Sequence, residues 1–189
     1  SGVSKYDGTT WKTFRKENGL AGNSIAAIAS DVHGTLWIGT SSAGVSKYDG
    51  TTWKTYRTED GLASNYITAV TPDSRGVIWI GTYDGGVSRF DGVSWKTYTV
   101  DDGLASNFIK SILVDSKGAV WFGTKGDGVT KYDGASFKTY TTRDGLVNNI
   151  VTTIAEDTRG VFWFGTNGGV SEFDGATWKN HVSYLDHSI

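Results

Sequence analysis

The sequence Val77-Ile78-Trp79-Ile80-Gly81-Thr82 indicates the fold, because its last four residues recur through the chain with a fixed period. The string Trp-Ile/Phe-Gly-Thr returns every 42 residues, starting at Trp37, Trp79, Trp121 and Trp163. A second string, Gly-Val-Ser/Thr-x-Tyr/Phe-Asp-Gly, has almost the same spacing and starts at Gly2, Gly44, Gly86, Gly128 and Gly169. A fixed period of about 20 to 50 residues is the signature of a repeat protein, in which each repeat is one small structural unit.

Each repeat has the pattern of four short β-strands. In the second copy, residues 65–71 and 77–82 are apolar enough for strands covered on both faces, whereas residues 87–90 and 95–99 are more polar. Turn sequences such as Asp73-Ser74-Arg75-Gly76 and Asp91-Gly92 separate these runs. No apolar stripe of helical period persists. The pattern therefore predicts an all-β fold, a β-propeller or propeller segment of four-stranded antiparallel blades.

The composition excludes several classes of protein. The chain has 189 residues, with 18 Lys and Arg against 20 Asp and Glu, and thus a formal net charge of −2. Without an excess of cations we expect no nucleic-acid partner. The absence of Cys removes disulfides, thiolate nucleophiles and Cys-ligated metals. No apolar run is long enough to insert into a membrane, and no cofactor motif stands out.

The phase of the repeat predicts a single propeller domain or fragment over residues 1–189. An N-terminal half blade (1–22) precedes blades at about 23–64, 65–106, 107–148 and 149–189. The half blade has only the two outer strands, and residues 184–189 resemble the lead-in to another inner strand. The chain is then a piece of a longer protein, one of two chains that share a larger ring, or an open ring. Because an incomplete ring exposes unpaired strand groups, we expect self-association.

The loops between the second and third strands are the candidate binding site. They differ most between copies, and loops on a rigid scaffold commonly carry function. The candidate ligand-binding residues in these loops are Tyr83, Asp84, Lys125, Asp127 and Asn167. Neutral drift at exposed turns would produce the same divergence, so both interpretations stay open.

The periodic residues are interpreted as structural. We expect the recurrent Trp residues to pack between blades and not to bind sugars. We expect Asn23, Asn65, Asn107 and Asn149 to close the preceding turns by hydrogen bonds. The acidic turns lack the spacing of a calcium loop. His33, His181 and His187 lie at different phases of the repeat, so neither a catalytic nor a metal site is predicted.

These strings resemble the two-component regulator propeller repeat. The likeness rests on Asn-x-Ile, Asp-x-x-Gly-x-x-Trp-Ile-Gly-Thr and Gly-Val-Ser-x-Tyr-Asp-Gly in four copies. The resemblance implies a periplasmic or extracellular sensor region of a bacterial signalling protein, often one that senses oligosaccharides. The predicted function is thus a non-catalytic module that binds a small molecule or glycan. The alternatives are a structural repeat scaffold without a specific ligand and, less favoured, a propeller lyase or hydrolase.

Overall fold

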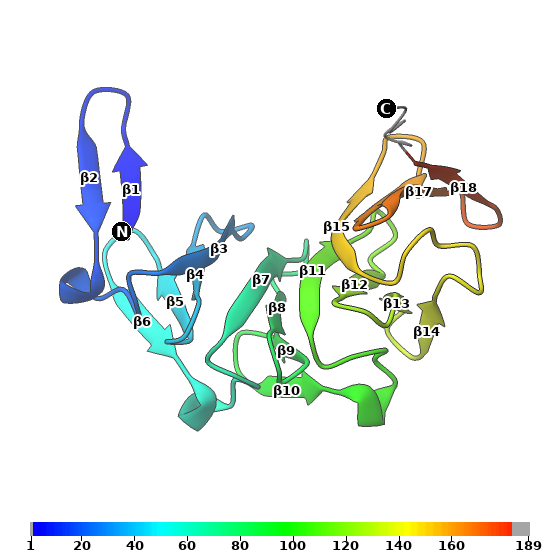
Figure 1. The fold of residues 1–189 in the computed structure, drawn as a ribbon. Coiled ribbons are helices and arrows are strands. Elements are labelled where there is room, and N and C mark those ends of the chain that lie inside the picture. The colour runs from blue at the N-terminus through cyan, green and yellow to red at the C-terminus, as the bar shows by residue number, and fades with distance from the viewer. Residues whose placement is uncertain (1, 183–189) are drawn as a thin grey trace, which may run out of the picture.

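The computed structural model describes residues 2–182, and their strands form an open arc of antiparallel sheets around a common axis (Figure 1). The first sheet is a two-stranded hairpin, β1 (Val3–Tyr6) and β2 (Trp11–Phe14). Each later sheet has four strands in chain order. These strands are β3 (Ile25–Ser30), β4 (Leu36–Thr40), β5 (Val45–Tyr48) and β6 (Trp53–Tyr56); β7 (Ile67–Pro72), β8 (Ile78–Thr82), β9 (Val87–Phe90) and β10 (Trp95–Tyr98); β11 (Ile109–Val114), β12 (Val120–Thr124), β13 (Val129–Tyr132) and β14 (Phe137–Tyr140); β15 (Val151–Glu156), β16 (Phe162–Thr166), β17 (Gly169–Phe173) and β18 (Trp178–His181).

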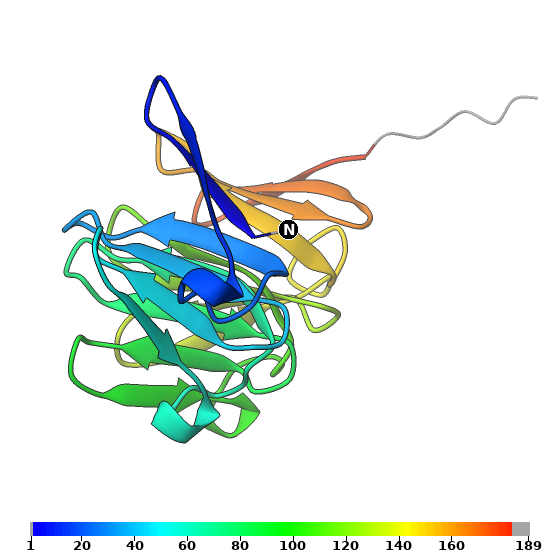
Figure 2. The ribbon, with the colours of Figure 1, turned by 90° about the vertical axis from the view of Figure 1, so that its left-hand side faces the viewer.

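The first strand of every four-stranded sheet lies at the centre of the arc. β3 packs against β7, β7 against β11, and β11 against β15. The hairpin β1–β2 and the sheet β15–β18 lie at the two ends of the arc (Figures 1 and 2). This arrangement confirms the predicted all-β propeller fold with four-stranded blades. Residues 184–189, interpreted above as the lead-in to another inner strand, lie outside the described residues.

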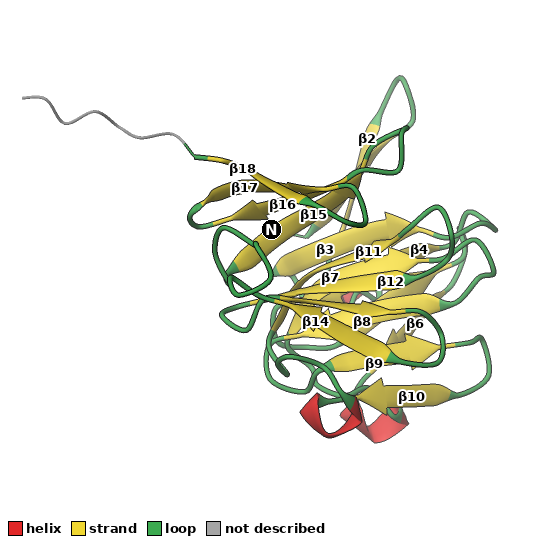
Figure 3. Cartoon of the chain, turned by 90° about the vertical axis from the view of Figure 1, so that its right-hand side faces the viewer, coloured by secondary structure: helices red, strands yellow, loops and turns green. Residues whose placement is uncertain are grey.

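Three single-turn 3₁₀ helices connect the outer strand of one blade to the inner strand of the next. They are η1 (Lys16–Asn18), η2 (Thr58–Asp60) and η3 (Val100–Asp102), and they lie on the outside of the arc (Figures 1 and 3). The periodic Asn side chains hold these connections. Asn23 Oδ1 accepts the backbone N–H of Lys16 at 2.8 Å, and Asn107 Oδ1 accepts that of Val100 at 2.9 Å. The same bond recurs at Asn65 and Asn149, which confirms the predicted structural role.

The core consists of apolar clusters between neighbouring blades. Trp37, Val45 and Tyr56 on one face of the first full blade contact Ile67 and Ile80 on the facing side of the second. Corresponding clusters join the second blade to the third and the third to the fourth. Trp37, Trp79 and Trp121 are buried in these clusters, as predicted, and Trp163 on the last blade is half-buried.

Each inner strand carries a β-bulge at one repeated position. The register shifts across Ala26, Thr68, Lys110 and Thr152. A bulge leaves one residue without a partner on the neighbouring strand and re-aims its side chain. In this fold, the four re-aimed side chains belong to the four strands that line the axis.

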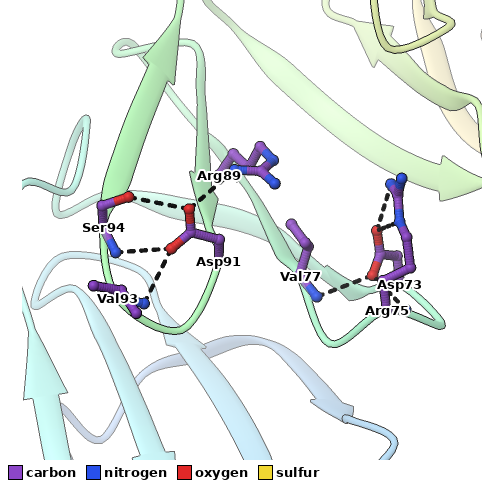
Figure 4. Close-up of polar contacts among 7 residues, drawn as sticks. All are labelled: Asp73, Arg75, Val77, Arg89, Asp91, Val93 and Ser94. Atoms are coloured by element: carbon purple, nitrogen blue, oxygen red, sulfur yellow. Dashed lines mark hydrogen bonds and ion pairs between the residues drawn. The ribbon is translucent and has the colours of Figure 1, made fainter.

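The hairpin between the third and fourth strands of each blade closes on an aspartate. Asp91 Oδ1 accepts the backbone N–H groups of Ser94 (2.8 Å) and Val93 (3.0 Å), and the Ser94 hydroxyl donates to Oδ2 (Figure 4). These bonds favour the charged carboxylate and lower the pKa of Asp91 to about 2, the N–H of Ser94 being the largest cause. The pKa of the corresponding carboxyl is also lowered in the other hairpins, at Asp7, Asp49, Asp133 and Asp174.

We predict that the protein keeps its stability from pH 7 to about pH 4 and loses stability as the pH falls toward 2. The pKa of these carboxyls is lower in the folded chain than the unfolded value of about 3.9, so their charged form favours folding above pH 4. Protonation then removes that contribution. Thermal denaturation at pH 7, 4 and 2.5 measures the effect. The variant Asp91→Asn keeps an acceptor oxygen that does not titrate. Between pH 7 and pH 2.5 it should therefore lose less stability than the unchanged chain. An equal loss would show that protonation of the Asp91 carboxylate does not contribute to the acid destabilisation.

Candidate functional site

The candidate site lies at the end of the axis where the second and fourth strands of each blade finish. There, the residue after each second strand donates its backbone N–H to the carbonyl of the residue just before the inner strand. The N–H of Tyr83 binds the Tyr66 carbonyl at 2.9 Å, and that of Lys125 binds the Phe108 carbonyl at 3.3 Å. We name the eight residues so joined the axial rim: Ser24, Ser41, Tyr66, Tyr83, Phe108, Lys125, Ile150 and Asn167.

Two hollows adjoin this rim. The first, of about 310 Å³, is lined by the four bulge residues of the inner strands together with Ile67, Tyr83 and Phe108. The second, of about 460 Å³, is lined by Ser41, Tyr66, Tyr83 and Asp84. Tyr83 lines both hollows, so they adjoin at this side chain. A concave region of this size, with aromatic walls and a few polar groups, fits a small ligand.

Aromatic rings and lysines meet in this region. The ring centroids of Tyr83 and Phe108 are 4.0 Å apart, at an interplanar angle of 53°. Lys125 Nζ lies 4.6 Å from the Phe108 centroid and 5.5 Å from that of Tyr83. Tyr66 and Tyr83 are both half-exposed, so part of each side chain is accessible to a ligand. Aromatic faces of this kind can stack on the apolar face of a sugar, while the phenol groups provide hydrogen bonds.

Lys110 brings a second cation to the first hollow. It stands at the bulge of β11, where the other inner strands carry Ala26, Thr68 and Thr152. Among residues 2–182, no ion pair within 4.0 Å involves Lys110 or Lys125. The Thr68 hydroxyl is buried without a hydrogen-bond partner in this part of the chain, whereas the Thr152 hydroxyl donates to the Gly165 carbonyl at 3.0 Å.

The structure brings three of the five candidate residues together. Tyr83 and Asp84 line the second hollow, and Lys125 stands over the Tyr83 ring. Asp127 and Asn167 lie in the corresponding loops of the next two blades, and neither lines the two hollows. The N–H of Asp127 donates to Thr124 Oγ1 at 3.0 Å, which is a turn bond.

Sequence reasoning did not select Tyr66, Phe108 or Lys110. A usable signal was present, because the four copies differ at these positions as much as they differ in the loops. The position before the inner strand is Ser24, Tyr66, Phe108 or Ile150, and the bulge position is Ala26, Thr68, Lys110 or Thr152. The sequence pattern places these positions in a buried strand and its lead-in, and it does not reveal a bulge that turns a strand residue toward the axis.

Neither a cluster of metal-ligating side chains nor a membrane-spanning helix occurs among the described residues. Residues 2–182 contain no group of three or more His, Cys, Asp or Glu side chains that could hold a metal ion. In the same range, no helix has the length and apolar character needed to cross a membrane.

The fold and the rim define a β-propeller of four-stranded blades with a ligand-sized hollow on its axis. A model of the two-component regulator propeller family matches residues 19–42, 61–84, 103–126 and 145–168. These four segments of 24 residues make 96 of the 189 residues, and the chain belongs to this family. Among curated proteins, the comparison found no significant match.

Solved structures with the same fold include extracellular domains of two-component systems and enzymes. The chain is similar to the extracellular domain of the putative hybrid two-component system BT3049 from B. thetaiotaomicron, with a TM-score of 0.78 and 24% identity. That match covers 89% of this chain and 24% of the other, so the chain spans about a quarter of that domain. Virginiamycin B lyase from Staphylococcus aureus matches with a TM-score of 0.68 and 16% identity, over 86% of this chain and 57% of the lyase. At these identities the likeness shows the fold alone.

Proposed function

We propose that the chain is a non-catalytic, ligand-sensing propeller module of a bacterial signalling protein, and that it binds an oligosaccharide or similar small molecule at the axial rim. Membership of the two-component regulator propeller family supports the signalling role. The likeness to extracellular domains of two-component systems supports a periplasmic or extracellular location.

One observation carries the binding proposal. Three aromatic rings and two lysines lie at the same end of the axis: Tyr66, Tyr83, Phe108, Lys110 and Lys125. Neither lysine forms an ion pair within the described residues. Each of the five residues differs from its equivalents in the other blades. Structural residues of this chain repeat from blade to blade, as the Trp and Asn positions do. Side chains that break the repeat and still gather at one end of the axis, beside the two hollows, are more consistent with recognition than with packing.

We predict that replacing Asp84 and Lys125 together with alanine abolishes glycan binding, with an affinity at least about 100-fold weaker, while the fold is kept. Such a loss corresponds to about 2.7 kcal/mol, which two polar contacts to a ligand can supply. Isothermal titration calorimetry with a panel of oligosaccharides measures the affinity, and circular dichroism measures the fold.

A matched double variant, Asp101→Ala with Lys117→Ala, removes the same two charges away from the rim. Asp101 lies in η3 on the outside of the arc, and Lys117 lies in the turn between β11 and β12 at the opposite end of the blade. This variant should bind like the unchanged chain. An unchanged affinity in the Asp84/Lys125 variant would show that these two residues do not belong to the binding site. If no oligosaccharide of the panel bound, the structural-scaffold alternative would be favoured.

A further inference from the structure

The inner strand of the third blade carries a lysine that the repeat does not require. Lys110 is the bulge residue of β11, which lines the axis together with β3, β7 and β15 (Figure 1). The corresponding residues of the other three blades are small and uncharged: Ala26, Thr68 and Thr152. Because alanine and threonine are accepted at this position, packing of the blade does not account for a charged side chain there.

Lys110 lies in the first hollow without a compensating charge. Its side chain is half-buried, and among residues 2–182 its ammonium group forms no ion pair and lies over no aromatic ring. By contrast, Lys54 on an outer strand lies over the Tyr56 ring, 4.8 Å from its centroid. Removing a charge from water without a partner costs free energy, so an anion in the hollow would stabilise this lysine.

Lys125 adds a second cation beside the same hollow. Its ammonium group lies over the rings of Tyr83 and Phe108, and both rings line the first hollow. Asp84 and Asp127 follow the second strands of their blades, but neither lines this hollow. The first hollow is therefore bordered by positive charge, whereas the second contains the carboxylate of Asp84.

The chain itself builds the first hollow. Its lining comes from the inner strands of all four blades and from the two rings of Tyr83 and Phe108. Its volume of about 310 Å³ is at the lower end of the range for small-ligand pockets. Aromatic walls suit the apolar face of a sugar ring, and ammonium groups form strong, charge-assisted hydrogen bonds with anionic oxygens.

We propose that the ligand of the axial rim is an anionic oligosaccharide, whose carboxylate or sulfate group lies in the first hollow and is bound by Lys110 and Lys125. This inference rests on the function proposed above and names its class of ligand. The sugar ring packs against Tyr83 and Phe108, and its neutral hydroxyl groups donate to Asp84 in the second hollow. The opposite charges of the two hollows set the orientation, because the anionic group is attracted by the lysines and repelled by Asp84.

The first test compares acidic oligosaccharides with their own neutral counterparts on the unchanged chain. Calorimetry measures the affinities for oligogalacturonates and oligomannuronates, and for the same oligosaccharides with their carboxyl groups reduced to alcohols. Sulfated galactan oligosaccharides are compared with their desulfated forms in the same way. In at least one pair the acidic member should bind at least about 10-fold more tightly. The two kinds of pair show whether a carboxylate or a sulfate is recognised.

Substitution of the two lysines tests the site. Lys110→Thr introduces the residue that two other blades have at this position, and Lys125→Asn introduces that of the last blade. Each variant should weaken binding of the acidic ligand and leave the affinity for its neutral counterpart unchanged, and the double variant should lose the preference. Lys110→Arg keeps the charge and should keep the preference. Lys117→Thr is the matched control, since Lys117 is exposed in the turn between β11 and β12 of the same blade; it should bind like the unchanged chain.

The outcomes separate this inference from the proposed function. Equal affinities for the two members of every pair would overturn the inference, while the proposed function would stand. An acidic preference that survived in the folded double variant would overturn the role of the two lysines. If neither acidic nor neutral oligosaccharides bound, both proposals would fail. Circular dichroism measures the fold of each variant, and the comparison of acidic with neutral ligands needs no variant.

Discussion

Replacing Gly81 with alanine is expected to lower the free energy of unfolding by about 2 kcal/mol and the melting temperature by about 5 °C. Gly81 is the glycine of the repeated Trp-Ile-Gly-Thr string, on β8 at the junction with the third blade. A Cβ at this position would lie 2.7 Å from Ile109 Cγ2 and 3.1 Å from Ile109 Cβ. Ile109 is fully buried and begins the inner strand of the next blade, so it can move only by shifting that strand.

Gly126→Ala is the matched control for this experiment. Nothing lies within 4 Å of a Cβ at Gly126, and its backbone is outside the left-handed region. Both substitutions remove the same flexibility from the unfolded chain, which alone stabilises a protein by about 0.4 to 1 kcal/mol. Gly126→Ala should therefore be neutral or slightly stabilising in thermal and urea denaturation. Equal stabilities of the two variants would show that the close approach at the Gly81 junction does not constrain the fold.

The blade architecture could be predicted because its physical constraints repeat. Gly81 leaves room for the inner strand of the next blade, Trp79 fills the junction between two blades, and Asn65 holds the connection through η2. Each of these constraints returns with the period of the blade. The expected strand at residues 77–82 corresponds to β8 (Ile78–Thr82), and that at 87–90 to β9 (Val87–Phe90). The strand expected at 65–71 begins two residues later, at Ile67, because Asn65 is engaged in closing η2.

The candidate site was less predictable, because its members are the residues that depart from the repeat. Divergence indicated the loop residues Tyr83 and Lys125, but it could not say which strand residues the bulges turn toward the axis. In the sequence, Lys110 has the pattern of an ordinary strand residue. Only the register shift between Ile109 and Ser111 places it at the first hollow. The binding role of the rim remains a prediction.

The turn between the first two strands illustrates how similar sequences can differ in their contacts. Asp115 Oδ2 accepts the indole N–H of Trp121 at 2.9 Å. In the blade before it, Asp73 Oδ2 instead accepts a hydrogen bond from the Arg75 guanidinium at 2.9 Å (Figure 4). The buried indole N–H of Trp79 has no partner among residues 2–182.

In the last blade, Arg159 donates to Asp157 Oδ2 in the same way, and the indole N–H of Trp163 reaches that oxygen only at 3.5 Å. An arginine two positions after the aspartate therefore accompanies a lost or a long indole bond.

Replacing Asp115 with alanine is expected to destabilise the protein by about 3 to 4 kcal/mol, more than Gly81→Ala does. Besides the indole bond, Asp115 Oδ1 accepts the backbone N–H groups of Lys117 (3.0 Å) and Ala119 (2.8 Å). Asp115, Ala119 and Trp121 are all buried, so water cannot replace the lost acceptor. A buried donor without a partner costs about 1 to 3 kcal/mol, and at least two donors lose theirs.

Urea denaturation of Asp115→Ala and Asp115→Asn separates the contributions. The asparagine keeps an oxygen for the two backbone N–H groups but turns an NH₂ group toward the indole N–H of Trp121, so it should lose about half as much stability as the alanine variant. Asp101→Ala, at an exposed position in η3, controls for the loss of one negative charge and should be within about 0.5 kcal/mol of the unchanged chain. If Asp115→Ala were as mild as this control, hydrogen bonding by the turn aspartate would not be what holds the first two strands of the blade together.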